Sequence, residues 1–175
     1  TTLAASVLNI LDGNTTGVAN ASTVTTLSGS ASDLNTAYSS LGISGLGNEA
    51  ILVDSGTSSV SLANNLSAAT SGIVSATLSD GDMATLANLN DSDNAYTITI
   101  SDTSVDASAL NILDSKTTVS INAAAVTTLS GSASDLNTAY SSLGISGLGN
   151  ETVTLTDTTL AASVLNILDG NTTGV

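Results

Sequence analysis

The chain has 175 residues, of which 15 are acidic and one is basic, and it contains no Cys, His, Pro, Trp or Phe. A formal charge of −14 argues against binding to nucleic acid or to an anionic membrane surface, because both require clustered Lys and Arg. The absence of His and Cys leaves little but Ser and carboxylates to act as nucleophile or base, so we expect no enzyme activity and no cofactor. The lack of Cys also excludes a disulfide scaffold. A hydrophobic fraction of 41% nevertheless permits a core, built from small side chains.

Short strands are predicted where apolar and hydroxyl residues alternate. In chain order these segments are Val18–Asn20, Ala50–Val53, Val74–Leu78, Tyr96–Ile100, Val119–Ile121 and Thr152–Leu155. Their centres are separated by about 22 to about 24 residues, except for two longer spacings of about 33 residues, all within the range of repeat periods. We assign the longer spacing to an extra turn at Ser22–Leu27.

Short amphipathic helices are predicted between the strands. The first follows Ser30–Asp33, which resembles a capping box with Asp in place of Glu or Gln. Its apolar face is predicted to carry Leu34, Ala37, Tyr38 and Leu41, and Gly42 is predicted to end it. Two more helices are indicated by Leu62, Leu66 and Ala69 before Gly72, and by Met83, Leu86 and Ala87 after Asp80.

The last predicted helix spans Thr158–Asp169, with Asp157 as its N-cap and Gly170 as its C-terminal stop. Its apolar residues, Leu160, Val164, Leu165 and Leu168, have the spacing of one helical face.

Internal repeats cover most of the chain. Residues 1–49 match residues 103–151 at an offset of 102, with Val24–Glu49 identical to Val126–Glu151. Residues 1–18 are identical to residues 158–175. The chain therefore starts and stops within the same repeated element, and we expect residues 1–175 to be one continuous fragment of a longer array.

The alternation of strand and helix predicts an α/β solenoid with one parallel sheet. Each coil, meaning one strand and the helix that follows it, has about 22 to about 24 residues, or about 33 where a turn is added. Leucine-rich repeats are the nearest architectural analogy. A parallel β-helix is the alternative, since Thr, Ser, Asn and Gly suit its tight turns.

Four aspartates follow predicted strands: Asp54, Asp80, Asp102 and Asp157. Stacked coils would align them in a column along one sheet edge, together with Asn20 and Asn122. Helix N-capping is the first interpretation, because each side chain can accept from the free N–H groups of the next helix. Calcium is the alternative, since it takes six to eight oxygen ligands. The sequence contains no EF-hand loop or calcium-binding nonapeptide.

Hydroxyl side chains are expected to line one face of the sheet. Thr97-Ile98-Thr99, Ser75-Ala76-Thr77 and Thr152-Val153-Thr154 place apolar residues on the opposite face. This pattern is typical of a solvated sheet face. The alternatives are a surface that contacts sugar or ice, or the attachment of glycans to Ser and Thr. The Gly-rich segment Gly42–Asn48 lacks the Lys of a phosphate-binding loop and is interpreted as a long turn.

The segments TLTDTTLAASVLNILDGNTTGV, VTTLSGSASDLNTAYSS and LGISGLGNE resemble the repeats of giant cell-surface proteins of marine cyanobacteria. Tyr96–Asp102 also resembles the strand-then-Asp units of giant adhesin-like proteins from other aquatic bacteria. This resemblance implies a very long secreted protein at the cell surface or in an extracellular matrix. It carries over no catalytic or binding residue.

Together these patterns predict a structural repeat protein of a cell surface or an extracellular fibre, acting as a spacer, adhesin or matrix element. Its expected partners are neighbouring repeats or copies of itself. No membrane span is expected, because no apolar run reaches about 18 residues. The alternative function is a repeat-based binding module for calcium or a glycan.

Overall fold

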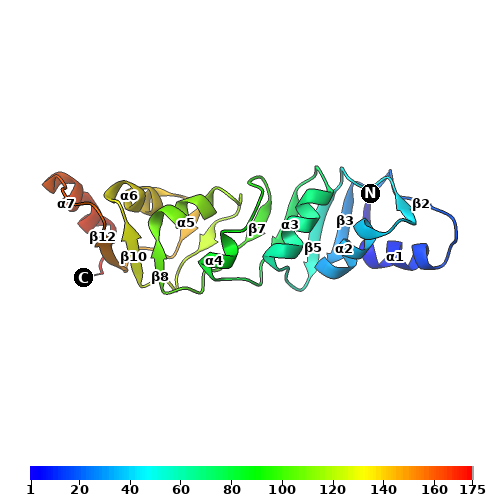
Figure 1. The fold of residues 1–175 in the computed structure, drawn as a ribbon, viewed down its shortest axis with the longest axis horizontal. Helices are drawn as coiled ribbons and strands as arrows, with labels where there is room; N and C mark the ends of the chain where they lie inside the picture. The colour runs from blue at the N-terminus through cyan, green and yellow to red at the C-terminus, as the bar shows by residue number, and fades with distance from the viewer. Residues whose placement is uncertain (175) are drawn as a thin grey trace. The chain divides into compact units, whose positions relative to one another are not determined.

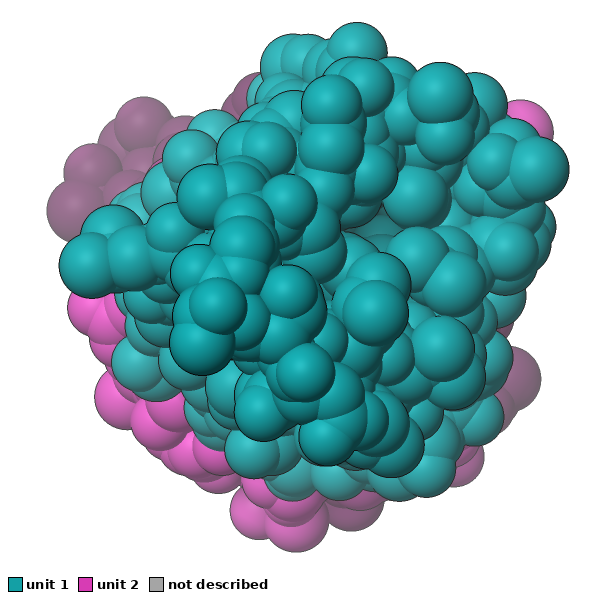
Figure 2. All heavy atoms as spheres, turned by 90° about the vertical axis from the view of Figure 1, so that its right-hand side faces the viewer, with its two compact units in different colours: residues 1–79, 89–97 teal, residues 80–88, 98–175 magenta. Residues whose placement is uncertain are grey.

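The computed structural model of the chain describes residues 1–174. Over these residues the chain is an α/β protein with seven helices and four parallel sheets, and none of the sheets closes into a barrel. It divides into two compact units, coloured separately in Figure 2. Unit 1 comprises residues 1–79 and 89–97, and unit 2 comprises residues 80–88 and those from 98 onward. The expectation of one continuous array stays a prediction.

Unit 1 is built on a five-stranded parallel sheet. Its strands, in spatial order, are β1 (Thr2–Ala4), β3 (Thr26–Ser30), β5 (Ala50–Ser55), β6 (Val74–Thr77) and β7 (Ala95–Thr97). Thr2 pairs with Thr26, which pairs in turn with Ala50. Each of these two steps spans 24 residues, as does the hydrogen bond from the Thr25 hydroxyl to the Thr1 carbonyl oxygen. Figure 1 shows β3 and β5 side by side.

Helices and a second, smaller sheet complete unit 1. The helices are α1 (Ala5–Gly13), α2 (Ala31–Ser39) and α3 (Val60–Ala69), and the small sheet pairs β2 (Ala19–Asn20) with β4 (Ile43–Ser44). Helix α2 contacts α1 on one side and α3 on the other. Each coil therefore carries a strand, a helix and in places a second short strand, each packed on its equivalent in the next coil.

Unit 2 repeats this arrangement. Its three-stranded parallel sheet has the order β12 (Thr152–Leu155), β10 (Thr128–Gly131), β8 (Ser104–Asp106), and a small sheet pairs β9 (Ile121–Asn122) with β11 (Ile145–Ser146). Its helices are α4 (Met83–Leu86), α5 (Ala107–Asp114), α6 (Ala133–Ser141) and α7 (Ala162–Asn171). Ser104 pairs with Thr128, and Thr128 pairs with Thr152. These steps again span 24 residues, as does the hydrogen bond from the Thr127 hydroxyl to the Thr103 carbonyl oxygen.

The core lies between each main sheet and its helices. Strand residues Leu27, Ile51 and Val74 are almost completely buried, as are helix residues Leu34 and Leu66. Most helices begin at a Ser or Asp whose side chain accepts the N–H three residues later, as in Ser30 with Asp33, which confirms the predicted N-cap. Alanine and leucine fill most helix core positions, so the coils pack closely around a thin core.

The predicted long coils and the single sheet are wrong. The segment that we assigned to an extra turn, Ser22–Leu27, leads into strand β3, so the longer spacing contains a strand that the pattern did not reveal. Its counterpart β10 divides the second long spacing in the same way. Beside the main sheets, the short strands that follow α1, α2, α5 and α6 pair in sheets of their own, which gives two sheets in each unit.

Several helix boundaries also differ from those predicted. Helix α2 ends at Ser39, so Leu41 does not lie on its apolar face and is 98% exposed. Helix α7 begins at Ala162 rather than Thr158, with Ala161 at the N-cap position. Thr158 and Thr159 lie in the connection between β12 and α7. The strand expected at Tyr96–Ile100 ends at Thr97.

Candidate functional site

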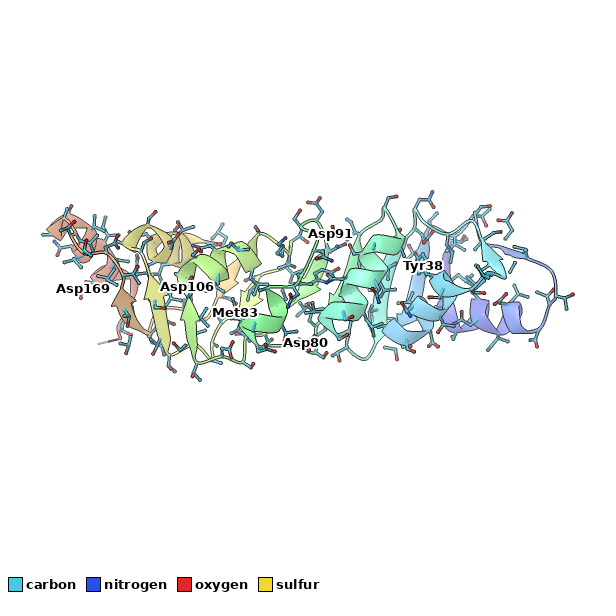
Figure 3. All side chains as sticks on the ribbon, in the orientation of Figure 1. Tyr38, Asp80, Met83, Asp91, Asp106 and Asp169 are labelled. Carbon is cyan, nitrogen blue, oxygen red and sulfur yellow. The ribbon has the colours of Figure 1, made fainter. Side chains whose placement is uncertain are left out.

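The four predicted aspartates occupy different surroundings. Asp54 is exposed on β5, and the N-cap of the following helix α3 is Ser59. Asp80 is half-buried before α4 (Figure 3), whose N-cap is Asp82, with Asp82 Oδ1 accepting the Thr85 N–H at 2.9 Å. The backbone hydrogen bonds to Thr85 lower the pKa of the Asp82 carboxyl. Ser59 and Asp82, rather than Asp54 and Asp80, therefore occupy the N-cap positions of these two helices.

Asp102 and Asp157 do cap helices, but not the helices that follow them. Asp102 Oδ2 accepts the backbone N–H of Met83 at 2.7 Å, and Asp157 Oδ2 accepts that of Ala133 at 2.6 Å. Each carboxylate thus binds the first turn of a helix that begins 19 or 24 residues earlier in the chain. These two aspartates connect one coil to the helix of the coil before it.

Asn20 and Asn122, the other members of the predicted column, stabilise turns. Asn20 Oδ1 accepts the Ser22 N–H at 3.0 Å, and Asn122 Oδ1 accepts the Ala124 N–H at 3.1 Å. Within residues 1–174, no three acidic side chains lie close enough together to hold a metal ion. Calcium binding by Asp54, Asp80, Asp102 and Asp157 stays a prediction.

Hydroxyl side chains form aligned rows on the outer sheet face of unit 2. Ser104, Thr128 and Thr152 are neighbours in register, and Ser130 is paired with Thr154 in the second row. In unit 1 the equivalent row is interrupted, because Leu52 lies between Ser28 and Ser75 and is 42% exposed. The predicted hydroxyl face is therefore present in unit 2 and incomplete in unit 1.

Two buried glutamates were not predicted from the sequence. Glu49 and Glu151 are the only glutamates of the chain, and they are 1% and 0% exposed. Both oxygens of Glu151 accept from the Gly149 N–H, at 3.0 and 2.9 Å, and Tyr140 donates its hydroxyl to the same carboxylate at 3.1 Å.

The first copy of this arrangement has the same partners. Gly47 N–H donates to both oxygens of Glu49, at 3.1 and 3.0 Å, and the Tyr38 hydroxyl donates to Oε1. The signal in the sequence was the repeated segment Gly-Leu-Gly-Asn-Glu, whose second glycine has a positive φ of 133° in the first copy and 131° in the second. That backbone conformation turns the N–H groups inward, where a carboxylate can accept them.

The following coil forms hydrogen bonds to the same turn. Thr70 donates its hydroxyl to the Glu49 carbonyl oxygen at 2.7 Å, and its own oxygen accepts the Gly72 N–H at 3.0 Å. Thr172 repeats both contacts with Glu151 and Gly174, at 2.8 and 3.0 Å. Each buried glutamate thus belongs to a hydrogen-bonded junction between successive coils.

The environments of the tyrosines suppress their ionisation. Burial and the nearby Glu151 carboxylate raise the pKa of Tyr140 to about 12. Burial also raises the pKa of Tyr96 to about 12, and burial together with the Glu49 hydrogen bond raises the pKa of Tyr38 further. The three hydroxyls therefore serve as hydrogen-bond donors around neutral pH.

No protein-family model, curated protein or solved structure matches the chain. Among residues 1–174, no helix is both long and apolar enough to cross a membrane, and the longest have ten residues.

Proposed function

We propose that the chain is a non-enzymatic structural repeat protein of a bacterial cell surface or an extracellular fibre, in which an α/β solenoid serves as a spacer, adhesin or matrix element. The observation that carries this proposal is the recurring parallel step of 24 residues between paired strands. In unit 1 this step separates Thr2 from its partner Thr26, and Thr26 from Ala50. In unit 2 it separates Ser104 from Thr128, and Thr128 from Thr152.

A recurring step between paired strands supports a role in which the protein acts through its length, as a spacer or a fibre does. Each coil satisfies its neighbours' backbone groups and buries its apolar edge on them, so adding a coil adds length without requiring a new kind of core. The junctions at Glu49 and Glu151 use the same contacts in both units, as expected of a unit that can be repeated.

An adhesive role is supported by apolar side chains that recur on the surface. Leu41 and its equivalent Leu143 are 98% and 97% exposed. Ile10, Ile112 and Ile167 occupy one repeat position and are 64%, 58% and 57% exposed. Large apolar side chains that stay exposed in every copy are suited to contact with another surface.

The proposed location rests on the resemblance to giant bacterial surface proteins. Antibodies raised against this chain should label intact cells that carry its gene, or material that such cells shed. Labelling that appears only after the cells are permeabilised would contradict the location.

The solenoid is tested by deleting one coil. Removal of residues 26–49 joins Thr25 to Ala50 and lets β5 take the place of β3 beside β1. The shortened chain should remain folded by circular dichroism and melt cooperatively. A matched deletion of residues 26–37 removes half a coil and should abolish cooperative melting. If the whole-coil deletion is as disruptive as the shorter one, the chain is not a solenoid.

A further inference from the structure

Two turns of the chain each carry a leucine that protrudes into solvent. Leu41 lies between α2 and β4 in unit 1 and is 98% exposed. Its equivalent Leu143 lies between α6 and β11 in unit 2 and is 97% exposed. Helix α2 contacts both α1 and α3, and α6 contacts both α5 and α7. The two leucines are therefore exposed although the coils that carry them are stacked on both sides.

A carboxylate is held beside the first of these leucines. Ser40, which precedes Leu41, donates its hydroxyl to Asp12 Oδ2 at 2.6 Å. The same carboxylate occupies the space where a Cβ at Gly42 would lie. Both neighbours of Leu41 in the chain are thus in contact with one negative charge.

The second copy of the turn has the same geometry. Ser142 donates its hydroxyl to Asp114 Oδ2 at 2.6 Å, and the Asp114 carboxylate occupies the Cβ position of Gly144. Leu143 lies between these two neighbours. Each turn therefore presents a protruding leucine and a fixed negative charge side by side. We call Leu41 and Leu143 the knob leucines.

Unit 2 contains a small apolar cavity between α4 and α5, two helices that lie side by side in Figure 1. Its volume is about 90 Å³. Side chains of both helices line it, among them Met83 (Figure 3), Leu86, Ile112 and Leu113. Lys116, the only basic residue of the chain, lines it as well. We call it the α4–α5 cavity.

The α4–α5 cavity and a knob leucine match in size. A cavity of about 150 Å³ holds benzene, which has six carbon atoms, so about 100 Å³ suits the four side-chain carbon atoms of leucine. The volume of about 90 Å³ is close to that value. Neither Leu41 nor Leu143 fills the cavity of its own chain, because both side chains are almost fully exposed.

The cavity and the turns also match in charge. The chain has 15 acidic residues and a single basic one, and that basic residue lines this cavity. A knob leucine that enters the cavity brings the carboxylate of its own turn towards Lys116, because the residues on both sides of the leucine contact that carboxylate. An apolar side chain beside a carboxylate is thus the complement of an apolar cavity beside a cation.

We propose that the α4–α5 cavity of one chain binds a knob leucine of a second copy of the same chain, with the carboxylate of Asp12 or Asp114 facing Lys116. The occupant is a second copy because the chain itself carries the complementary turn twice. The two surfaces differ, so the contact is heterologous and can continue from one copy to the next. The proposal rests on the proposed adhesive role of the exposed leucines and names their partner.

A single contact of this kind is weak. One leucine and its turn bury far less than the surface of about 800 Å² per partner that stable complexes bury. Chains that carry several such turns and cavities gain affinity by binding at more than one of them. For the 175-residue chain we therefore expect the contact at concentrations near about 1 mM.

The methyl group of Met83 reports on the cavity, because Met83 is the only methionine of the chain and lines the cavity wall. A chain labelled with ¹³C at this methyl group gives one methionine signal in an NMR spectrum. Adding unlabelled wild-type chain to about 1 mM should shift that signal. Unlabelled chain with Leu41→Lys and Leu143→Lys lacks both knob leucines, so the concentration that gives half of the shift should rise at least about tenfold.

The matched control for this double variant is Val18→Lys with Ile73→Lys. It makes the same change of charge at two other exposed apolar positions and should shift the Met83 signal as the wild type does. Ala87→Phe in the labelled chain fills the cavity from an exposed position on its wall and should abolish the shift. Lys116→Gln in the labelled chain should weaken binding about threefold, because the contact loses its charge pair.

A Met83 signal that stays unchanged when wild-type chain is added would overturn the proposal. Equal shifts caused by the knob double variant and by its control would overturn it too, since the cavity would then bind some other part of the chain. Binding that is unaffected by Lys116→Gln would contradict the facing of the carboxylate towards Lys116. None of these results bears on the coil-deletion test, so the failure of this proposal and the failure of the solenoid are distinguishable.

Discussion

Asp157 Oδ2 lies 2.6 Å from the backbone nitrogen of Ala133, so the carboxylate that follows β12 caps the helix of the preceding coil. Asp102 has the same relationship to Met83 at 2.7 Å. In both cases the acceptor and the donor are distant in sequence, and the hydrogen bond forms only when two coils are stacked. The aspartates therefore contribute to stacking as well as to the start of a helix.

Replacing Asp157 with Ala should lower the free energy of unfolding by about 1 kcal/mol, because the first turn of α6 loses a charged acceptor. Urea denaturation followed by circular dichroism measures this change. Asp54→Ala is the matched control, since Asp54 is exposed, and it should change the stability by less than about 0.5 kcal/mol. Equal effects of the two substitutions would show that the Ala133 contact does not stabilise the fold.

Replacing Glu151 with Ala should be much more damaging, at about 3 kcal/mol, because it leaves the Gly149 N–H and the Tyr140 hydroxyl without their acceptor in a buried site. Chemical denaturation compares this variant with Asn150→Ala, which alters the exposed neighbour and should cost less than about 0.5 kcal/mol. A Glu151→Ala chain as stable as Asn150→Ala would exclude a structural role for the carboxylate.

Alkaline pH should destabilise the chain through its tyrosines. The pKa values of Tyr96 and Tyr140 are raised from 10.0 to about 12 in the folded state. Because folding raises these values, the associated stability is complete below about pH 10 and is lost as the pH rises through about 12. Tyrosinate absorbance and circular dichroism, recorded together, should show ionisation coinciding with unfolding. Tyr140→Phe should make the loss of stability in this pH range smaller, and an unchanged profile would contradict the assignment.

Two glycines should respond to alanine in opposite directions. A Cβ at Gly72 would lie 2.3 Å from the carbonyl oxygen of Glu49, so Gly72→Ala should force the junction apart and cost about 2 kcal/mol. A Cβ at Gly13 would meet nothing within 4 Å, and this residue ends α1. Gly13→Ala should therefore raise the stability by about 0.5 kcal/mol. Thermal melting ranks the two variants, and the reverse order would contradict the geometry of the junction.

Calcium should leave the melting temperature unchanged. The oxygens of Asp102 and Asp157 already accept helix N–H groups, and the acidic side chains of residues 1–174 do not gather into a group of three. Scanning calorimetry in EDTA and in about 5 mM CaCl₂, above the affinity range of extracellular calcium modules, checks this expectation. A rise caused by calcium but not by magnesium would support the binding-module function instead.

Periodicity in the sequence predicted the elements whose apolar residues are dense enough to define a pattern. Strands β5, β6 and β12 and helix α3 fall where alternation or i, i+4 spacing placed them. Strand β3 was missed because Thr-Leu-Ser-Gly-Ser contains one large apolar side chain and a glycine. It becomes a strand because β1 and β5 supply parallel partners on both sides, which is information from other coils.

The junction residues could not be predicted for a different reason. Glutamate is rarely buried unless it is paired, so residue type alone gives no reason to expect Glu49 and Glu151 in the interior. Their burial depends on a turn with positive φ and on a tyrosine eleven residues earlier in the chain. Likewise, Leu41 was expected in the core because its spacing fits a helical face, but α2 ends before reaching it.

The parallel register that pairs Thr2 with Thr26 and Thr26 with Ala50 also bears on how the gene of this protein can change. Unequal recombination between verbatim repeats removes or inserts DNA in multiples of the repeat. When the exchanged segment encodes whole coils, the new junction brings together edges that already fit, and the reading frame and the hydrogen-bond register are both preserved. If the proposed solenoid is correct, a single genetic event can therefore change the number of coils while each new junction keeps strands that already pair.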